Sequence, residues 1–186
     1  MTPHSRLTAF VLLALALPVC LYSLPARDQA PADPAVRAAQ EANIQESVLR
    51  YFIVNWQKSS EQIQSKSKDP HVHRIPNFVK SQTCFISLNG EDPSDDFLRK
   101  IGDLPCLAKK ASQMGEVNWY ISDPVTREPA PLFTVRNIRW IKPAVCRVDV
   151  VFQICRENYC EAEQVYQVEH VRSQWKVTRL VGYVLH

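Results

Sequence analysis

The chain has 186 residues, 46% of them hydrophobic, which predicts one folded domain with tails and argues against global disorder. Its net charge is only +3, and its lysines and arginines are scattered singly or in pairs. This pattern argues against a nucleic-acid binder, which would carry a continuous basic surface.

The N-terminus has the layout of a secretory signal. A short basic start precedes an uncharged apolar run over residues 7–20, and small residues follow it. We predict a signal peptide at 1–23, cleaved after Ser23 or Ala26, and therefore a secreted or periplasmic protein. The alternative is a protein anchored in the membrane by an uncleaved segment, because the run extended to Leu24 approaches a spanning length.

The rest of the chain divides into two parts. Residues 24–37 are rich in proline and alanine and predict a flexible linker, and residues 38–186 predict a single cone-like α+β domain. The chain has only four glycines against thirteen prolines. Turns must therefore use Asn, Asp and Pro where glycine is the usual choice.

The domain opens with a helix. Apolar residues recur with helical spacing and predict a helix over 36–57; they are Ile44, Val48, Tyr51, Phe52 and Trp56. Residues 58–76 are polar and predict a long exposed loop. His71 and His73 alternate within it, but no partner residue stands at a recognised metal-ligand spacing, so we predict no metal site.

The middle of the domain combines a strand with a short helix. We expect a strand over 82–88, closed by Asn89-Gly90, and a helix over 93–101. Asp92 is the expected cap of this helix. Asp95 and Asp96 lie in its first turn, where they complement the helix dipole.

The last seventy residues predict a run of strands separated by short turns, which is typical of an antiparallel meander. The expected strands cover 116–122, 131–141, 144–155, 161–171 and 174–184. Apolar and polar residues alternate cleanly along the third of these strands, which indicates one buried face. The fold class we predict is α+β, with the N-terminal helix packed on a curved antiparallel sheet of four to five strands.

Five cysteines remain if Cys20 leaves with the signal, and export permits disulfides. Cys155 and Cys160 flank a four-residue turn and are one candidate pair. Cys84 and Cys106 could both flank the short helix and are the second. Cys146 is expected to be a buried thiol that packs as a small hydrophobic residue.

Two registers are possible for the hairpin between the third and fourth strands. One places Cys155 directly opposite Cys160. The other places residue 156 opposite Cys160 and Val150 opposite Tyr166, and it buries more apolar surface. A slip of one residue exchanges the two faces of a strand, so the registers differ in what they bury.

A long helix, a shorter helix and a meander together resemble the cone-shaped superfold shared by ketosteroid isomerases, scytalone dehydratase and nuclear transport factors, with the cystatins as a near neighbour. Residues 89–98, Asn-Gly-Glu-Asp-Pro-Ser-Asp-Asp-Phe-Leu, and the closing segment 166–177 also resemble a set of uncharacterised secreted bacterial proteins. That set has no established activity. The cystatin inhibitory loop, Gln-Xaa-Val-Xaa-Gly, has no good counterpart, because residues 164–168 lie mid-strand and contain no glycine.

The resemblance implies pocket residues that can be tested. Chemistry of the ketosteroid-isomerase kind needs an Asp base and a Tyr donor inside the cone, and Asp149 and Tyr166 are the nearest candidates. Tyr51 and Trp56 are further candidates to line the pocket, although aromatic residues at such spacings more often belong to a core.

No motif of nucleophilic catalysis, phosphate binding or dinucleotide binding is present, so we assign no catalytic residue and no cofactor. We therefore predict an exported, non-catalytic domain that binds a small apolar ligand or a protein partner. Contact with a membrane is expected only if the signal is uncleaved. The alternative is an isomerase, dehydratase or hydrolase that uses an open apolar cavity in the cone.

Overall fold

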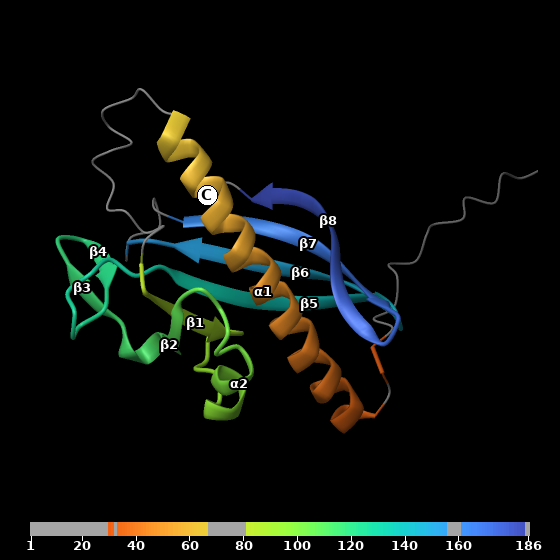
Figure 1. Cartoon of the computed structure of the whole chain (residues 1–186). Helices are drawn as coiled ribbons and strands as arrows, with labels where there is room; N and C mark the ends of the chain where they lie inside the picture. The colour runs from red at the N-terminus through yellow and green to blue at the C-terminus, as the bar shows by residue number, and fades with distance from the viewer. Residues whose placement is uncertain (1–29, 32, 67–80, 156–160, 185–186) are drawn as a thin grey trace, which may run out of the picture.

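A computed structural model describes residues 30–31, 33–66, 81–155 and 161–184. One long helix lies across one face of a six-stranded sheet, and a separate two-stranded sheet lies near one end of the molecule (Figure 1). The protein is therefore α+β, as the sequence predicts.

The helix α1 (Pro34–Lys66) is longer than the predicted 36–57. It begins inside the predicted linker because Asp33 caps it: Asp33 Oδ1 accepts a hydrogen bond from the backbone N–H of Ala35 at 2.8 Å. Pro34 suits the first helical position because it has no N–H to satisfy. The helix also continues into the predicted loop, since Ser, Glu, Gln and Lys are all compatible with a helix interior.

The large sheet is mixed and has more strands than the four or five predicted. In spatial order its strands run β2-β1-β5-β6-β7-β8. The meander from β5 to β8 is antiparallel, as predicted, whereas β1 pairs in parallel with both β2 and β5. The strands are β1 (Thr83–Leu88), β2 (Leu107–Lys110), β5 (Leu132–Lys142), β6 (Val145–Gln153), β7 (Glu161–Val171) and β8 (Gln174–Val184).

The strand β2 was not predicted, because its sequence Leu-Ala-Lys-Lys has no strand-like alternation. It is tied to β1 by a disulfide between Cys84 and Cys106, whose Cα atoms lie 5.9 Å apart. This is one of the two cysteine pairs that we expected. A parallel pairing of this kind depends on chain segments that meet only in the folded protein, so no local pattern indicates it.

The predicted strand over 116–122 is a hairpin of two short strands, β3 (Gly115–Val117) and β4 (Tyr120–Ser122). Asn118 and Trp119 form the turn, with φ of 49° and 74°. Positive φ at both central residues is the signature of a type I′ turn, in which glycine is strongly preferred at the second position. Because tryptophan stands where glycine is usual, the sequence pattern did not predict a turn here.

The short helix α2 (Asp95–Lys100) is capped differently from the prediction. Its cap is Ser94, whose Oγ accepts from the N–H of Phe97 at 3.2 Å. The expected cap, Asp92, instead accepts a hydrogen bond at 2.9 Å from the N–H of Ser112, within the 3-10 turn η3 (Ala111–Gln113). Either residue type caps a helix, so the sequence alone did not distinguish them.

The register between β6 and β7 is neither of the two expected. Val148 lies opposite Tyr166, and Val150 lies opposite Gln164. This register keeps the apolar residues of β6 on the face predicted by the second alternative, but it shifts the strands by two residues. Cys155 is buried at the end of this hairpin, and Cys160 lies outside the described residues, so their pairing stays a prediction.

The main core lies between α1 and the sheet. The inner face of the helix buries most of the predicted apolar stripe against the sheet, including β8, whereas Tyr51 stays 41% exposed. Each fully buried Leu, Ile or Val contributes roughly 1.5–3 kcal/mol. The completely buried helix residues are Ile44, Val48, Leu49 and Ile53, with Phe52 nearly so. A smaller core around Phe85 and Ile121 holds the β3–β4 hairpin on the other face of β1.

The disulfide should contribute strongly to stability, because it closes a loop of 22 residues. Loop-closure entropy for this length corresponds to about 3 kcal/mol. We expect the Cys84→Ala/Cys106→Ala double variant to lose about 3 kcal/mol of the free energy of unfolding. The loss appears as a lower urea midpoint in a titration followed by circular dichroism. Reduction of the wild-type disulfide should reproduce the loss, and an unchanged midpoint would contradict this role.

Candidate functional site

Three of the four residues predicted to line a pocket come together between α1 and the sheet. The rings of Tyr51 and Tyr166 meet edge to face with centroids 5.6 Å apart. Trp56 packs against Phe152 at 4.8 Å and against Phe133 at 5.7 Å. Tyr166 and Trp56 therefore belong to the core between α1 and the sheet, and Tyr51, which is 41% exposed, lies at its edge.

This aromatic cluster is part of a packed core. Phe52 lies between Tyr166 and Phe133 and contacts both rings edge to face. Tyr166 is buried, its hydroxyl is hydrogen-bonded to Gln164, and burial raises the pKa of its phenol, with further contributions from Tyr51 and Tyr183. The phenol therefore stays protonated at neutral pH and acts as a structural group.

The fourth predicted residue, Asp149, lies on the opposite face of the sheet. Its neighbours Val148 and Val150 point into the core, and successive strand residues face opposite sides. Asp149 is 3% exposed and accepts hydrogen bonds from Arg139 Nη1 at 2.6 Å and from Asn137 Nδ2 at 3.0 Å. The Asp149–Tyr166 pair suggested by the resemblance is therefore wrong, because the sheet separates the two side chains.

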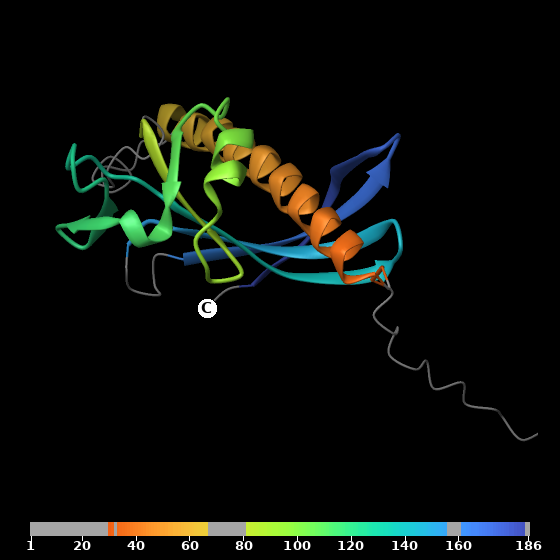
Figure 2. The ribbon, with the colours of Figure 1, turned by 90° about the horizontal axis from the view of Figure 1, so that it is seen from below.

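A groove lies between the N-terminal half of α1 and the tip of the β7–β8 hairpin. Its volume is about 490 Å³. Figure 2 shows the hairpin tip curling up toward the side of the sheet that α1 covers. The lining residues are Gln40, Asn43, Glu46, Ser47, Arg50, His170, Ser173, Gln174 and Trp175.

The chemistry of this groove is polar and nearly uncharged. Its two charged residues compensate each other, since Arg50 Nε lies 3.0 Å from Glu46 Oε1, and Arg50 also pairs with Asp103 at 2.6 Å. Gln40 Oε1 is buried and has no hydrogen-bond partner among the described residues. The groove therefore offers amide and hydroxyl groups to a ligand without an attractive net charge.

The wall formed by the hairpin is held rigidly. Trp175 packs edge to face on Trp140 with centroids 5.5 Å apart, and His170 packs on Trp175 at 5.1 Å. Ser47 Oγ donates a hydrogen bond to the Trp175 carbonyl at 2.7 Å and so joins α1 to the hairpin. Sequence reasoning missed the groove because Gln, Asn and Ser on a helix look like an ordinary solvated face.

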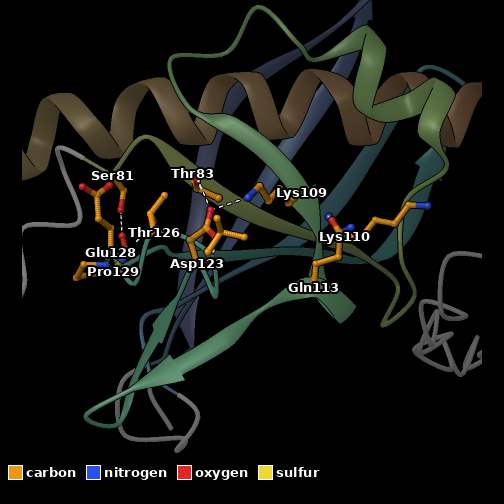
Figure 3. Close-up of polar contacts among 10 residues, drawn as sticks. Ser81, Thr83, Lys109, Lys110, Gln113, Asp123, Thr126, Glu128 and Pro129 are labelled. Carbon is orange, nitrogen blue, oxygen red and sulfur yellow. Dashed lines mark hydrogen bonds and ion pairs between the residues drawn. The ribbon is translucent and has the colours of Figure 1, made fainter.

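A second polar cluster is centred on Asp123, in the turn after β4 (Figure 3). The Asp123 carboxylate is 1% exposed and accepts from Lys109 Nζ at 2.6 Å, Thr83 Oγ1 at 3.0 Å and the Val125 N–H at 2.9 Å. The hydrogen bond from Lys109 is the main cause that lowers the pKa of Asp123 from 3.8 to about 2. These contacts fix the turn in place and leave no carboxylate oxygen free for catalysis.

Two further predicted features have limited chemistry. Burial raises the pKa of the Cys146 thiol to about 12, so it is a protonated core group, as its sequence context predicted. His71 and His73 lie outside the described residues. Among the residues that are described, no group of three His, Cys, Asp or Glu side chains is placed to hold a metal ion.

Comparison with known proteins gives no relative. No family model matches the chain, and neither a curated protein nor a solved structure matches it significantly. Over the ranges that the structure covers, no helix combines the length and the apolar character needed to cross a membrane.

The Asp123 network makes a testable contribution to acid stability. Because the folded state lowers the pKa of Asp123 from 3.8 to about 2, it stabilises the fold above pH 4, and this stability is lost as the pH falls toward 2. We expect Asp123→Asn to lose about 2 kcal/mol at neutral pH and to flatten the acid limb of the stability curve. The control is Asp95→Asn, which removes the exposed ion pair with Lys110 and should change the free energy of unfolding little.

The buried thiol gives a second prediction. Since the raised pKa of Cys146 leaves almost no thiolate, native protein should not be alkylated at Cys146 by iodoacetamide at mildly alkaline pH. Peptide mass spectrometry should detect the adduct only after denaturant is added. Rapid labelling of Cys146 in the folded protein would show that the site opens to solvent.

Proposed function

We propose that this is an exported, non-catalytic binding domain whose groove between α1 and the β7–β8 hairpin holds an extended, uncharged segment of a protein partner. The observation that carries the proposal is the lining of the groove. It combines amide and hydroxyl side chains with the edge of an aromatic pair, and its charges are already paired. Such a surface suits the N–H and C=O groups of a polypeptide backbone.

The dimensions of the groove support a peptide ligand. Its helical wall runs from Gln40 to Arg50, which at the rise of an α-helix is about 15 Å. An extended chain covers roughly 3.3 Å per residue, so this length accommodates about four to five residues. The unpartnered Gln40 Oε1 provides an acceptor for one backbone N–H of the ligand.

The disulfide supports the proposed export. A bond between Cys84 and Cys106 persists in oxidising surroundings and is rare in a reducing cytosol. It agrees with the signal-like N-terminus and with a secreted or periplasmic location. An uncleaved signal that anchors the domain to a membrane is compatible with the same groove.

The alternative of an isomerase, dehydratase or hydrolase has less support. The space expected to form an open cone is occupied by the side chains of the core, and Asp149 lies on the far side of the sheet from Tyr166. In the groove, the imidazole of His170 packs against Trp175, and the one lining carboxylate, Glu46, is paired with Arg50.

The proposal predicts that displayed peptides can be selected on the groove. Purified protein is panned against a random library of linear heptapeptides, and the selected peptides are measured by fluorescence anisotropy. Asn43→Trp fills the groove, and Gln174→Ala removes one of its amides. We expect each change to weaken the binding of the selected peptides by about tenfold.

The matched control is Asn55→Trp, the same substitution at an exposed position of α1 outside the groove lining. It should bind the selected peptides as the wild type does. The proposal fails if no peptide is enriched, or if Asn43→Trp and Asn55→Trp weaken binding equally.

A further inference from the structure

A second hollow lies on the β3–β4 hairpin, away from the groove. Its volume is about 160 Å³, and it is lined by Val117, Asn118, Tyr120, Ser122, Arg127 and Pro129. Strand register explains this set: Val117 lies opposite Tyr120, and Gly115 opposite Ser122, so these positions share one face of the hairpin. Ile121 points the other way, into the small core around Phe85.

The hollow contains a buried hydroxyl that the fold leaves unsatisfied. Ser122 is 1% exposed, and its Oγ has no hydrogen-bond partner among the described residues. Nearly all buried polar groups in native proteins are hydrogen-bonded, so a hydroxyl left alone in a hollow needs an explanation. A ligand atom that accepts a hydrogen bond from the Ser122 hydroxyl would satisfy this group.

Arg127 lines the same hollow and adopts an unfavourable backbone conformation. Its φ is 63°, a left-handed value that glycine and asparagine adopt more easily. The turn holds it there, because the Arg127 N–H donates to the Asp123 carbonyl at 2.8 Å while the Asp123 carboxylate is bound by Lys109. Glycine or asparagine would adopt this backbone conformation at a lower energy cost. The turn therefore gives no reason for an arginine at this position, which leaves a role for its guanidinium.

The acidic groups around the hairpin do not neutralise Arg127 in this hollow. The Asp123 carboxylate is committed to Lys109 and Thr83, and Figure 3 shows the Glu128 carboxylate on the side of Ser81. Glu116 lies opposite Ile121 and so belongs to the other face of the hairpin. Over the described part of the chain, no ion pair forms at the Arg127 guanidinium.

We propose that this hollow binds a phosphate or sulfate group. A guanidinium presents a fork of N–H donors that matches such an oxyanion, and the Ser122 hydroxyl and the Asn118 amide add further donors. The volume admits one tetrahedral anion but excludes a nucleoside attached inside the hollow. Any larger part of the ligand must therefore lie outside, near the exposed Trp119 at the tip of the hairpin, which is 67% exposed.

The test is a titration followed by ¹H–¹⁵N NMR, with inorganic phosphate and sulfate added at constant ionic strength against sodium chloride. We expect saturable shifts of the amides of residues 117–122 and 127 and of the Trp119 indole. Ser122→Ala should weaken the binding of phosphate by about tenfold. It should not lower the melting temperature, because it removes an unsatisfied buried hydroxyl.

Arg127→Asn tests the guanidinium, because asparagine tolerates the left-handed backbone and the turn should be retained. Its matched control is Arg172→Asn, the same change at an exposed, left-handed arginine of the β7–β8 turn. Phosphate binding should be weakened by Arg127→Asn and not by Arg172→Asn.

A second arm distinguishes a free anion from a lipid headgroup. Sedimentation with vesicles of phosphatidylglycerol, compared with phosphatidylcholine, is measured for the same variants. Binding of inorganic phosphate supports a free anion as the source, and vesicle binding that Ser122→Ala abolishes supports a headgroup, since that change leaves the net charge intact. The inference is overturned if neither probe binds, if Ser122→Ala binds both as the wild type does, or if both arginine variants weaken binding equally.

Discussion

The structure depends on the burial of one face of α1 across the sheet. The same helix has two roles, because one of its faces packs in the core and a neighbouring face lines the groove. Ile44, Val48 and Phe52 enter the core, while Asn43 and Ser47, one position before two of them, form the wall of the groove. The packing that stabilises the domain therefore also fixes the geometry of the proposed binding site.

Because glycine is scarce, the turns beside the groove and beside the hollow on the β3–β4 hairpin have a strained backbone. The chain has four glycines, and the turns at Asn118-Trp119 and Arg172-Ser173 use other residues with positive φ. One turn borders the small hollow, and the other supplies Ser173 to the groove. Buried contacts hold two strained turns in place, namely Asp123 with Lys109 at the turn that contains Arg127 and Trp175 with Trp140 beside the β7–β8 turn.

The proposed sites differ in the kind of recognition they offer. The groove between α1 and the hairpin has paired charges and many neutral donors and acceptors, so it discriminates by shape and hydrogen bonding. The hollow on the β3–β4 hairpin has a buried hydroxyl and a guanidinium that forms no ion pair with any described residue, so the recognition proposed there is by charge. Different elements build the two sites, and they share no lining residue.

From the sequence by itself, the apolar stripe from Ile44 to Trp56 and the alternation in the C-terminal strands determined the helix, the meander and the core. These features are periodic and local, and burial of one face enforces them. Tertiary structure alone decided the parallel strand β2 and the two-residue shift between β6 and β7. It also decided both hollows, because the groups that line each one are far apart in the chain or share a face only once the strands are paired.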